Sequence, residues 1–254
     1  MQSKLLSRRD LDFLLYEWLD TEALTRRPRF ADHSRETFSA ALDTAEKIAT
    51  DLFAPHNRQS DEQEPHAVPG NMSAETGGNT LQVQMIPAVK TALDAYIGAG
   101  LVAAGQDYEL GGMQLPVTVE KLLAAYCTAA NVSTTSYMFL TIGNANTLLK
   151  TGTPDQVRRF VQPMLEGRFF GTMCLSEPQA GSSLSDITTR AEPDPVSGPA
   201  AGPEGERQYR LTGNKMWISG GEHELAGNIV HLVLAKIPGP DGKLIPGVKG
   251  ISLF

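Results

Sequence analysis

The chain has 254 residues, and its 22 basic and 29 acidic side chains give a net charge of −7. This balance excludes a general nucleic-acid-binding protein, which needs a basic surface, and the 41% hydrophobic content excludes a largely disordered chain. No stretch approaches the roughly 18 consecutive apolar residues of a membrane-spanning helix, and Asp10 and Asp12 interrupt the N-terminal segment too early for a secretory signal.

Apolar spacing predicts helices over the first two thirds of the chain. The first helix carries an apolar stripe at Leu11, Leu14, Leu15, Trp18 and Leu19. Ser34 is the expected N-cap of a second helix that Pro55 stops, and Pro87 and Pro116 open two more. Residues 57–80 between them are polar and rich in glycine, which predicts a loop.

The last two predicted helices lie before Gly167, where the residue pattern changes from helical to strand-like. Residues 133–149 are nearly uncharged, which indicates a helix buried on most faces. Thr153 to Gln156 form a capping box with proline at the first helical position, and Gly167 ends the helix that follows.

Strand patterns replace helical ones after Gly167. We expect strands over 169–176, 187–191, 229–236 and 250–254. A hairpin is expected over 207–219, with its turn at 212–215. Residues 192–206 are rich in proline and glycine and predict a surface loop. The fold class is therefore α+β, divided into an N-terminal helical extension (1–36), a helical domain (37–168) and a β domain (169–254).

Several familiar motifs are absent or misleading. Residues 98–103 match a loose dinucleotide pattern, GxGxxA, but the residues before them have helical spacing, so these glycines are expected to end a helix. The five histidines show no metal-ligand spacing and are expected on the surface or in loops, and no metal site is predicted. Two distant cysteines, Cys127 and Cys174, indicate a reducing compartment, so we expect a cytoplasmic protein.

The first informative block is FGTMCLSEPQAGSS at 170–183. An apolar strand runs here into a turn of small residues, where backbone groups lie beside the hydroxyls of Ser176 and Ser182. Gly181 permits a positive φ or a close ligand approach. A flat heteroaromatic ring and a pyrophosphate both fit such a turn, although the residues alone favour a plain β-turn in an unliganded sheet.

The second block is GNKMWIS at 213–219. If it is a strand, Trp217 and Ser219 point to the same face, because alternate residues do. An indole beside a hydroxyl gives a planar cofactor a wall and one hydrogen bond. The alternative is a core tryptophan with a nearby solvent-facing serine.

Together these blocks resemble the middle-domain signature of the acyl-CoA dehydrogenase family. Residues 175–183 (LSEPQAGSS) and 209–219 (YRLTGNKMWIS) carry the likeness, with GQDYELGG at 105–112 and residues 152–171 similar to other family segments. The likeness covers roughly residues 80–254. The N-terminal DLDFLLYEWLD looks more like the subgroup that includes 3-methylmercaptopropionyl-CoA dehydrogenase. The family implies a helical N-terminal domain, an antiparallel β-barrel-like domain, and a C-terminal helical bundle that this chain stops short of.

The resemblance also implies residue roles toward FAD. The implied FAD-contacting residues are Met173, Leu175, Ser176, Gly181, Ser182, Trp217, Ile218 and Ser219. Of these, Ser182 also matches a position near the CoA part of the substrate. Ser183 stands where many members have Asp, which puts any role of that carboxylate in doubt. Glu177 is interpreted as structural support for the turn.

The implied reaction is α,β-dehydrogenation of an acyl-CoA in fatty acid metabolism, with electrons passed to electron-transfer flavoprotein. In the family a Glu of the C-terminal bundle removes the α-proton, so no catalytic residue is assigned and the chain is expected to be a fragment, inactive alone. The full-length protein is expected to form a homo-oligomer without a membrane span. Two alternatives stay open: an acyl-CoA oxidase, which would form hydrogen peroxide, and a non-enzymatic flavoprotein or regulatory module of the same fold.

Overall fold

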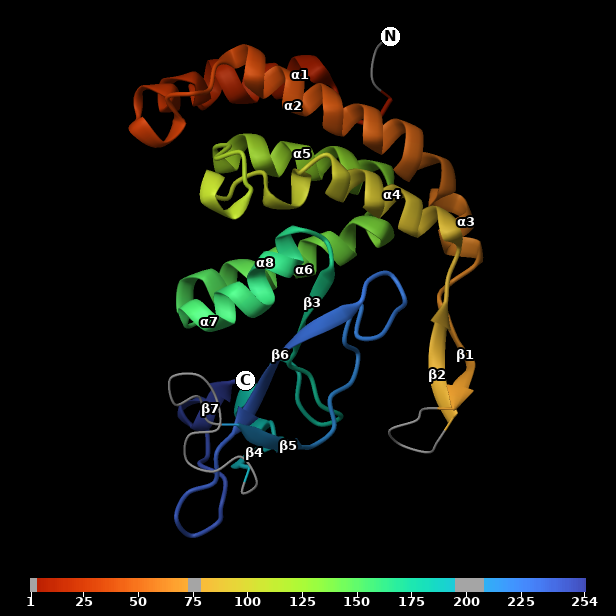
Figure 1. Cartoon of the computed structure of the whole chain (residues 1–254), viewed down its shortest axis with the longest axis vertical. Coiled ribbons are helices and arrows are strands. Elements are labelled where there is room, and N and C mark those ends of the chain that lie inside the picture. Colours follow the sequence, from red (N-terminus) through yellow and green to blue (C-terminus); the bar gives the residue numbers. More distant parts are fainter. Residues whose placement is uncertain (1–3, 73–78, 195–207) are drawn as a thin grey trace.

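Figure 1 shows a computed structural model of the chain, which describes residues 4–72, 79–194 and 208–254. Its helices are α1 (Arg8–Asp12), α2 (Arg35–Ile48), α3 (Asn57–Glu62), α4 (Pro87–Gly98), α5 (Val117–Ala130), α6 (Val132–Thr151), α7 (Pro154–Gln156) and α8 (Gln162–Leu165). Its strands are β1 (His66–Met72), β2 (Asn79–Gln84), β3 (Phe169–Cys174), β4 (Arg190–Pro193), β5 (Tyr209–Thr212), β6 (Asn228–Lys236) and β7 (Ile251–Leu253). Helices thus come first and most strands last, as expected, and the change falls between Leu165 and Phe169.

The helix starts follow the predicted signals, but the predicted stop at Pro55 is wrong: α2 ends at Ile48, and the chain stays helical through short turns that include Pro55 until α3. The Ser34 hydroxyl accepts a hydrogen bond from the Thr37 backbone N–H at 3.3 Å, and Thr37 Oγ1 accepts one from the Ser34 N–H. Thr153 and Gln156 form the same reciprocal pair at the start of α7. The glycines of the GxGxxA match lie where α4 ends, so they do not open a nucleotide-binding helix.

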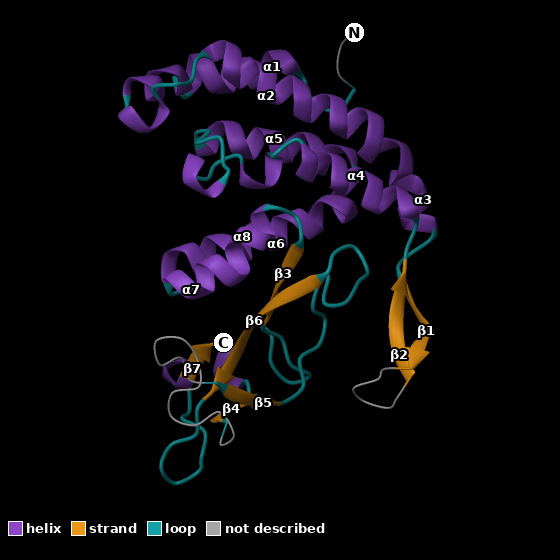
Figure 2. Cartoon of the chain, in the orientation of Figure 1, coloured by secondary structure: helices purple, strands orange, loops and turns teal. Residues whose placement is uncertain are grey.

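The helices stack in layers above the main sheet (Figure 2), and their interior is mainly apolar, with a few buried polar side chains such as His56, Asn131 and Asn144. Phe38 and Leu42 of α2 and Tyr126 of α5 are almost fully buried, as is Phe53, whose ring meets that of Tyr96 edge-on with centroids 6.4 Å apart. These apolar faces therefore pack in a single core, where burial is the main stabilising term. The stripe predicted for the first helix is only partly buried: Leu11 and Leu15 lie in the core, but Trp18 is 70% exposed and Leu19 52%.

Helix α6 departs from its prediction. Met138, Ala145 and Leu148 are buried, but Phe139 is 74% exposed, so only part of the helix circumference is covered. The lack of charge over residues 133–149 predicts a helix that is buried on most faces. This prediction is wrong because the exposed face of the segment carries apolar and small side chains instead of charges.

Residues 57–80 are not a plain loop, and the N-terminal region is not all helical. Helix α3 begins at Asn57, and β1 and β2 pair antiparallel, with His66 opposite Gln84 and Pro69 opposite Leu81. In Figure 1 this hairpin projects from the helices beside the main sheet. Its polar side chains hid it from a prediction based on apolar alternation, because both of its faces carry exposed residues.

The main sheet differs from the expected antiparallel barrel. Its order is β3-β6-β4-β5, with β7 pairing β6, and no closed barrel exists within the described residues. Strands β3 and β6 run parallel from Phe169 opposite Asn228 to Cys174 opposite Val233, whereas β4–β5 and β6–β7 are antiparallel. Parallel pairing needs a long connection, and 53 residues separate Cys174 from Asn228.

The predicted hairpin over 207–219 is wrong. Strand β5 ends at Thr212 and pairs with β4, while residues 214–218 form no strand. The expected strand over 187–191 begins later, at Arg190, and those over 229–236 and 250–254 correspond to β6 and β7. Most of the predicted 192–206 loop lies outside the described residues.

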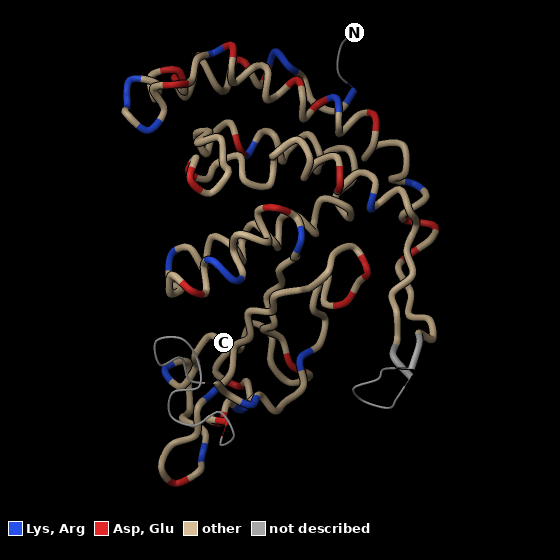
Figure 3. Tube along the Cα trace, in the orientation of Figure 1, with Lys and Arg blue, Asp and Glu red and all other residues tan. Residues whose placement is uncertain are grey.

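Charged residues of both signs are interspersed along the helices (Figure 3). Several form pairs one helical turn apart, such as Lys47 with Asp51 and Lys90 with Asp94. Within the described ranges, no helix combines the length and apolar character that crossing a bilayer requires.

Candidate cofactor site

The first predicted segment leaves β3 at the parallel edge of the sheet. Met173 is 40% exposed while its neighbours Thr172 and Cys174 are buried, as alternation along a strand dictates. Leu175 and Ser176 follow, half-buried, where the strand ends. This segment therefore presents one exposed apolar side chain just before the strand ends.

The second predicted segment lies directly against the first. The Met216 backbone N–H donates to the Ser176 carbonyl oxygen at 3.1 Å. Trp217 has φ +58° and is 74% exposed, so it does not share a strand face with Ser219 as predicted. Left-handed backbone costs a tryptophan about 1–2 kcal/mol, and its effect here is to turn the indole outward.

The turn after Glu177 is open on its outer side. Glu177 and Ala180 exchange backbone hydrogen bonds of 2.8 and 3.0 Å, and Gly181, Ser182 and Ser183 follow on the surface. Gly181 does not have a positive φ, but a Cβ there would meet nothing within 4 Å. Of the two roles expected for this glycine, only close ligand approach remains.

Glu177 lies beneath both segments. Its side chain is among the most deeply buried, and Lys215 Nζ donates to its Oε1 at 2.8 Å. Burial acts to raise the pKa of this carboxyl, but hydrogen bonds from Lys215, Thr189 and Thr188 outweigh that effect and hold the pKa well below its usual range. The structural reading of Glu177 is thus consistent with its surroundings.

Helix α6 is fastened to the sheet beside this site. Asn144 Nδ2 donates to the carbonyl oxygens of Thr172 at 3.1 Å and Val230 at 2.7 Å, one on each parallel strand. Thr141 Oγ1 accepts from the Gly171 N–H at 3.1 Å. A Cβ on Gly171 would lie 2.6 Å from that of Asn144, so the close approach requires glycine. Sequence reasoning missed these residues because polar groups in a helix of small residues carry no periodic signal.

Two cavities flank α6 on opposite sides. One, of about 660 Å³, lies between α5, α6 and β3, with Phe139, Gly143 and Met173 in its wall. The other, of about 1140 Å³, lies between α3, α4, α6 and the loop that contains Ile218 and Gly220. The predicted residues are therefore close along the backbone, but Met173 and Ile218 line different cavities.

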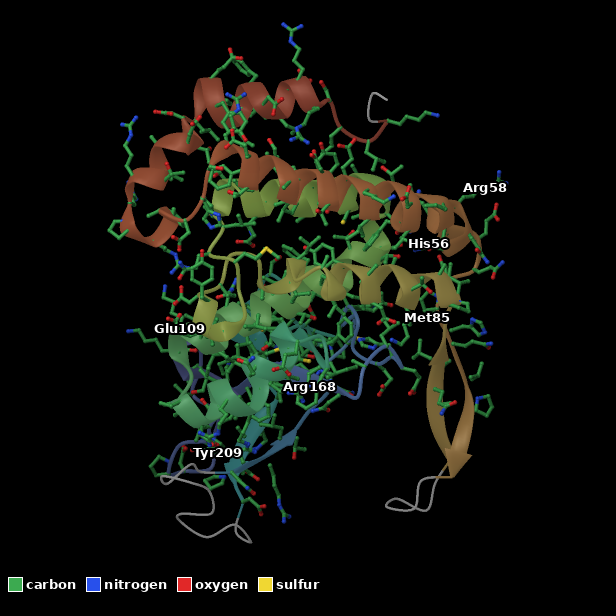
Figure 4. All side chains as sticks on the ribbon, turned by 45° about the horizontal axis from the view of Figure 1, so that its top comes forward. His56, Arg58, Met85, Glu109, Arg168 and Tyr209 are labelled. Atoms are coloured by element: carbon green, nitrogen blue, oxygen red, sulfur yellow. The ribbon has the colours of Figure 1, made fainter. Side chains whose placement is uncertain are left out.

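The second cavity begins where the β1–β2 hairpin leaves the helices. Figure 4 shows His56, Arg58 and Met85 grouped at this end of the helical layers. His56 is buried, contrary to the expected surface position, with its ring nitrogens 2.7 Å from the Leu52 carbonyl oxygen and 2.9 Å from Thr134 Oγ1. Burial lowers its pKa. No cluster of three or more metal-ligating side chains occurs in the described part of the chain.

His223 is also buried, on the loop that follows Ser219. Its ring meets Phe170 and Tyr137 edge-on, with centroids 5.0 and 5.2 Å away. Its Nδ1 accepts the Leu225 N–H at 3.2 Å. Burial, with a smaller effect of His231, lowers the pKa of His223 to about 4, so the ring is neutral at pH 7.

The chain is similar to known proteins along nearly its whole length. It is 31% identical over 252 residues to a butyryl-CoA dehydrogenase of Syntrophomonas wolfei, covering 99% of this chain and 38% of that protein. It is 31% identical over 241 residues to 3-methylmercaptopropionyl-CoA dehydrogenase of Ruegeria pomeroyi, covering 94% and 36%. The chain thus spans little more than a third of these relatives. No family model matches it.

Solved structures share the fold. A Bacillus anthracis acyl-CoA dehydrogenase complexed with FAD superposes with a TM-score of 0.61 at 20% identity, over 88% of this chain and 31% of that one. At 20% identity this match shows a shared arrangement of helices and strands and nothing more.

Proposed function

Because the chain is a homologue of the acyl-CoA dehydrogenases, we propose that it supplies FAD-contacting segments of an enzyme that α,β-dehydrogenates an acyl-CoA thioester in fatty acid metabolism. The observation that carries the proposal is the contact between the two signature segments, made by the Met216 N–H on the Ser176 carbonyl. The segments are 40 residues apart in sequence, yet this hydrogen bond joins their backbones.

The exposed residues of the two segments have side chains that suit a flavin. Met173 and Trp217 expose apolar side chains against which a flat ring can lie, and Leu175, Ser176 and Ile218 are half-buried in the same two segments. Ser219 is exposed and offers a hydroxyl. When bound, FAD would supply the hydride acceptor, which no side chain can provide.

The turn residues fit the more polar parts of the ligands. The open space at Gly181 permits close approach of a pyrophosphate to the backbone, and Ser182 offers a hydroxyl to the pyrophosphate or to the CoA part of the substrate. Ser183 brings no charge where many relatives have a carboxylate. These roles are carried over from the resemblance and supported by exposure.

The whole enzyme's chemistry needs a base that we assign to no residue here. An α-C–H is too weakly acidic for a carboxylate unless the enolate is stabilised at the thioester oxygen and the base sits in a dry pocket. Glu177 does not qualify, because its carboxylate is already saturated with donors and its pKa is low. We therefore propose that this chain alone lacks turnover, and that the complete protein passes electrons to electron-transfer flavoprotein.

The likeness to the acyl-CoA dehydrogenases also underlies our proposals on the domains of the chain and its cellular location. We propose the division into residues 1–36, 37–168 and 169–254, supported by the change from helix to strand after Leu165. The free, buried Cys127 and Cys174 support a cytoplasmic location. Assembly into a homo-oligomer is proposed for the full-length protein only, by resemblance to the family.

Titration of the purified chain with FAD, followed by quenching of flavin fluorescence, tests the proposal. We expect saturable binding that Gly181→Ala and Trp217→Ala weaken by about tenfold, because each alters the proposed contact surface. Phe13→Ala, which removes an exposed apolar side chain far along the sequence, is the matched control and should bind as the wild type does. Absence of FAD binding by the wild type, or dehydrogenation of an acyl-CoA by this chain with a dye as acceptor, would contradict the proposal.

A further inference from the structure

We propose that Glu177 and Lys215 form a positioning pair that sets the distance between the two flavin-contacting segments. Neither residue is offered as a flavin contact; both act through Leu175, Ser176 and Trp217. The inference rests on the proposed function, since it concerns how that site is held ready for its ligand.

The Glu177 carboxylate is a meeting point of three chain segments. Its side chain is 1% exposed. Its Oε1 accepts hydrogen bonds from the Thr189 N–H at 3.1 Å, Thr189 Oγ1 at 2.6 Å and Lys215 Nζ at 2.8 Å. Its Oε2 accepts from the Thr188 N–H at 2.7 Å, Thr188 Oγ1 at 2.9 Å and Gln179 Nε2 at 2.8 Å. Six donors thus fix the carboxylate, so its position is determined from every side.

Lys215 connects this carboxylate to the predicted flavin surface. Besides Glu177, its Nζ donates to the Leu175 carbonyl oxygen at 3.0 Å. The next residue, Met216, donates its N–H to the Ser176 carbonyl. Trp217 follows immediately, so the indole is placed by two consecutive residues that are each bonded to the first segment.

Gly213 permits the chain to reach this position. A Cβ on Gly213 would lie 2.8 Å from the Thr189 Cα and 2.4 Å from its Oγ1, distances that side chains do not tolerate. After β5 the backbone must therefore pass directly over Thr189. This backbone path brings Lys215 within hydrogen-bond distance of Glu177. It also explains why the second signature has glycine at position 213.

The pair differs from the other ion pairs of the chain. Most described pairs join residues within four positions of each other, and the long-range pairs Arg8–Asp43, Arg29–Asp107 and Arg210–Asp194 each keep one side chain at least 49% exposed. Glu177 and Lys215 are 38 residues apart, with side chains only 1% and 13% exposed. A buried ion pair contributes little net stability, because desolvation offsets the attraction, but it tolerates few alternative geometries. Positioning is therefore the better account of why these two charges are buried here.

The test compares Glu177→Gln and Lys215→Met, singly and together, with the wild type. We expect each single variant to weaken FAD binding by about tenfold or more and to change the visible circular dichroism of the bound flavin, because a shifted Trp217 alters the ring's surroundings. The double variant should lose little more than either single one, since both remove the same interaction. Glu166→Gln, which breaks the exposed Arg168–Glu166 pair, is the control and should leave affinity and spectrum unchanged.

Hydrogen exchange without FAD separates positioning from general unfolding. In the variants we expect faster exchange at the amides of Thr188, Thr189 and Met216, with α5 protected as in the wild type. If both single variants bind FAD with unchanged affinity and spectrum, or if exchange rises equally everywhere, the inference fails while the proposed function stands. If the wild type takes up no FAD, the proposed function fails and this inference fails with it.

Discussion

The helical region and the main sheet have different kinds of interior. The helices share one continuous apolar cluster, to which Phe38, Leu42, Phe53 and Tyr126 belong. In the sheet region the buried residues include Thr172, Glu177, Thr189 and Lys236. Among its buried apolar side chains, Phe170 and Leu232 belong to that cluster, whereas Cys174, Ala180, Ile187, Ala191 and Ala235 lie outside it.

The contrast shows what each kind of interior is suited to. Apolar burial is non-directional, so it holds helices together over a range of small displacements. Hydrogen bonds to a buried carboxylate or lysine have narrow distance and angle requirements, so they fix a loop in one place. The hydrogen-bond network around Glu177 occurs in the part of the chain where the predicted cofactor residues lie.

The largest effect is expected from a truncation in the apolar interior. Phe53→Ala should lower the free energy of unfolding by about 3–5 kcal/mol, because it removes a fully buried ring and leaves a cavity beside Tyr96. Urea unfolding followed by far-ultraviolet circular dichroism measures it. Phe13→Ala, at a side chain that is 50% exposed, should change it by less than about 1 kcal/mol. Equal losses in the two variants would show that the helical core is not where the structure places it.

A pH series tests the buried ring at the junction of the two regions. His223 takes up a proton at pH about 4 when folded but near 6.5 when unfolded, so the unfolded state binds it first as pH falls. The free energy of unfolding should therefore decrease by up to about 3 kcal/mol between pH 6.5 and 4, and not above that range. In His223→Asn, which keeps an acceptor for the Leu225 N–H, this part of the slope should disappear. An unchanged slope in the variant would assign the acid sensitivity to other groups.

A smaller effect is expected where two backbones touch. Gly213→Ala should destabilise the protein by about 1–3 kcal/mol, because the new methyl group meets Thr189 at less than contact distance. Gly98→Ala is the matched control: its Cβ would meet nothing within 4 Å at the end of α4, so we expect no loss or a gain of up to about 1 kcal/mol. Thermal unfolding of both variants, compared with the wild type, measures these changes in stability. If Gly213→Ala is as stable as the wild type, the backbone at residue 213 does not lie as close to Thr189 as the structure shows.

The same contrast explains what could be read from the sequence. Ser34, Pro87 and Thr153 gave the helix starts correctly, since capping and apolar spacing are local properties. The predicted hairpin at 207–219 failed because β5 pairs with β4 and the following residues are held by Lys215, a contact 38 residues distant in sequence. Turn residues alone do not reveal such a partner.

The cofactor roles of the site residues stay a prediction, but the relative position of the segments that carry them can be compared with the sequence. The two signature segments do meet, at Ser176 and Met216, although spacing alone gave no reason for them to. The orientation of Trp217 could not be foreseen, because a positive φ at a tryptophan runs against its own preference and is imposed by the surroundings. Asn144 was missed altogether, since a helical asparagine that bonds to two strands has no signature in sequence.

The two hydrogen bonds that Asn144 donates to β3 and β6 restrict how α6 can move against the sheet. Its amide spans the carbonyls of two adjacent parallel strands, so α6 cannot rotate or slide against β3 and β6 without breaking both bonds at once. These bonds therefore oppose relative motion of helix and sheet at this point. Any widening of the cavity beside Met173 has to come from α5 or from side-chain rotamers, and the sheet edge serves as its fixed wall.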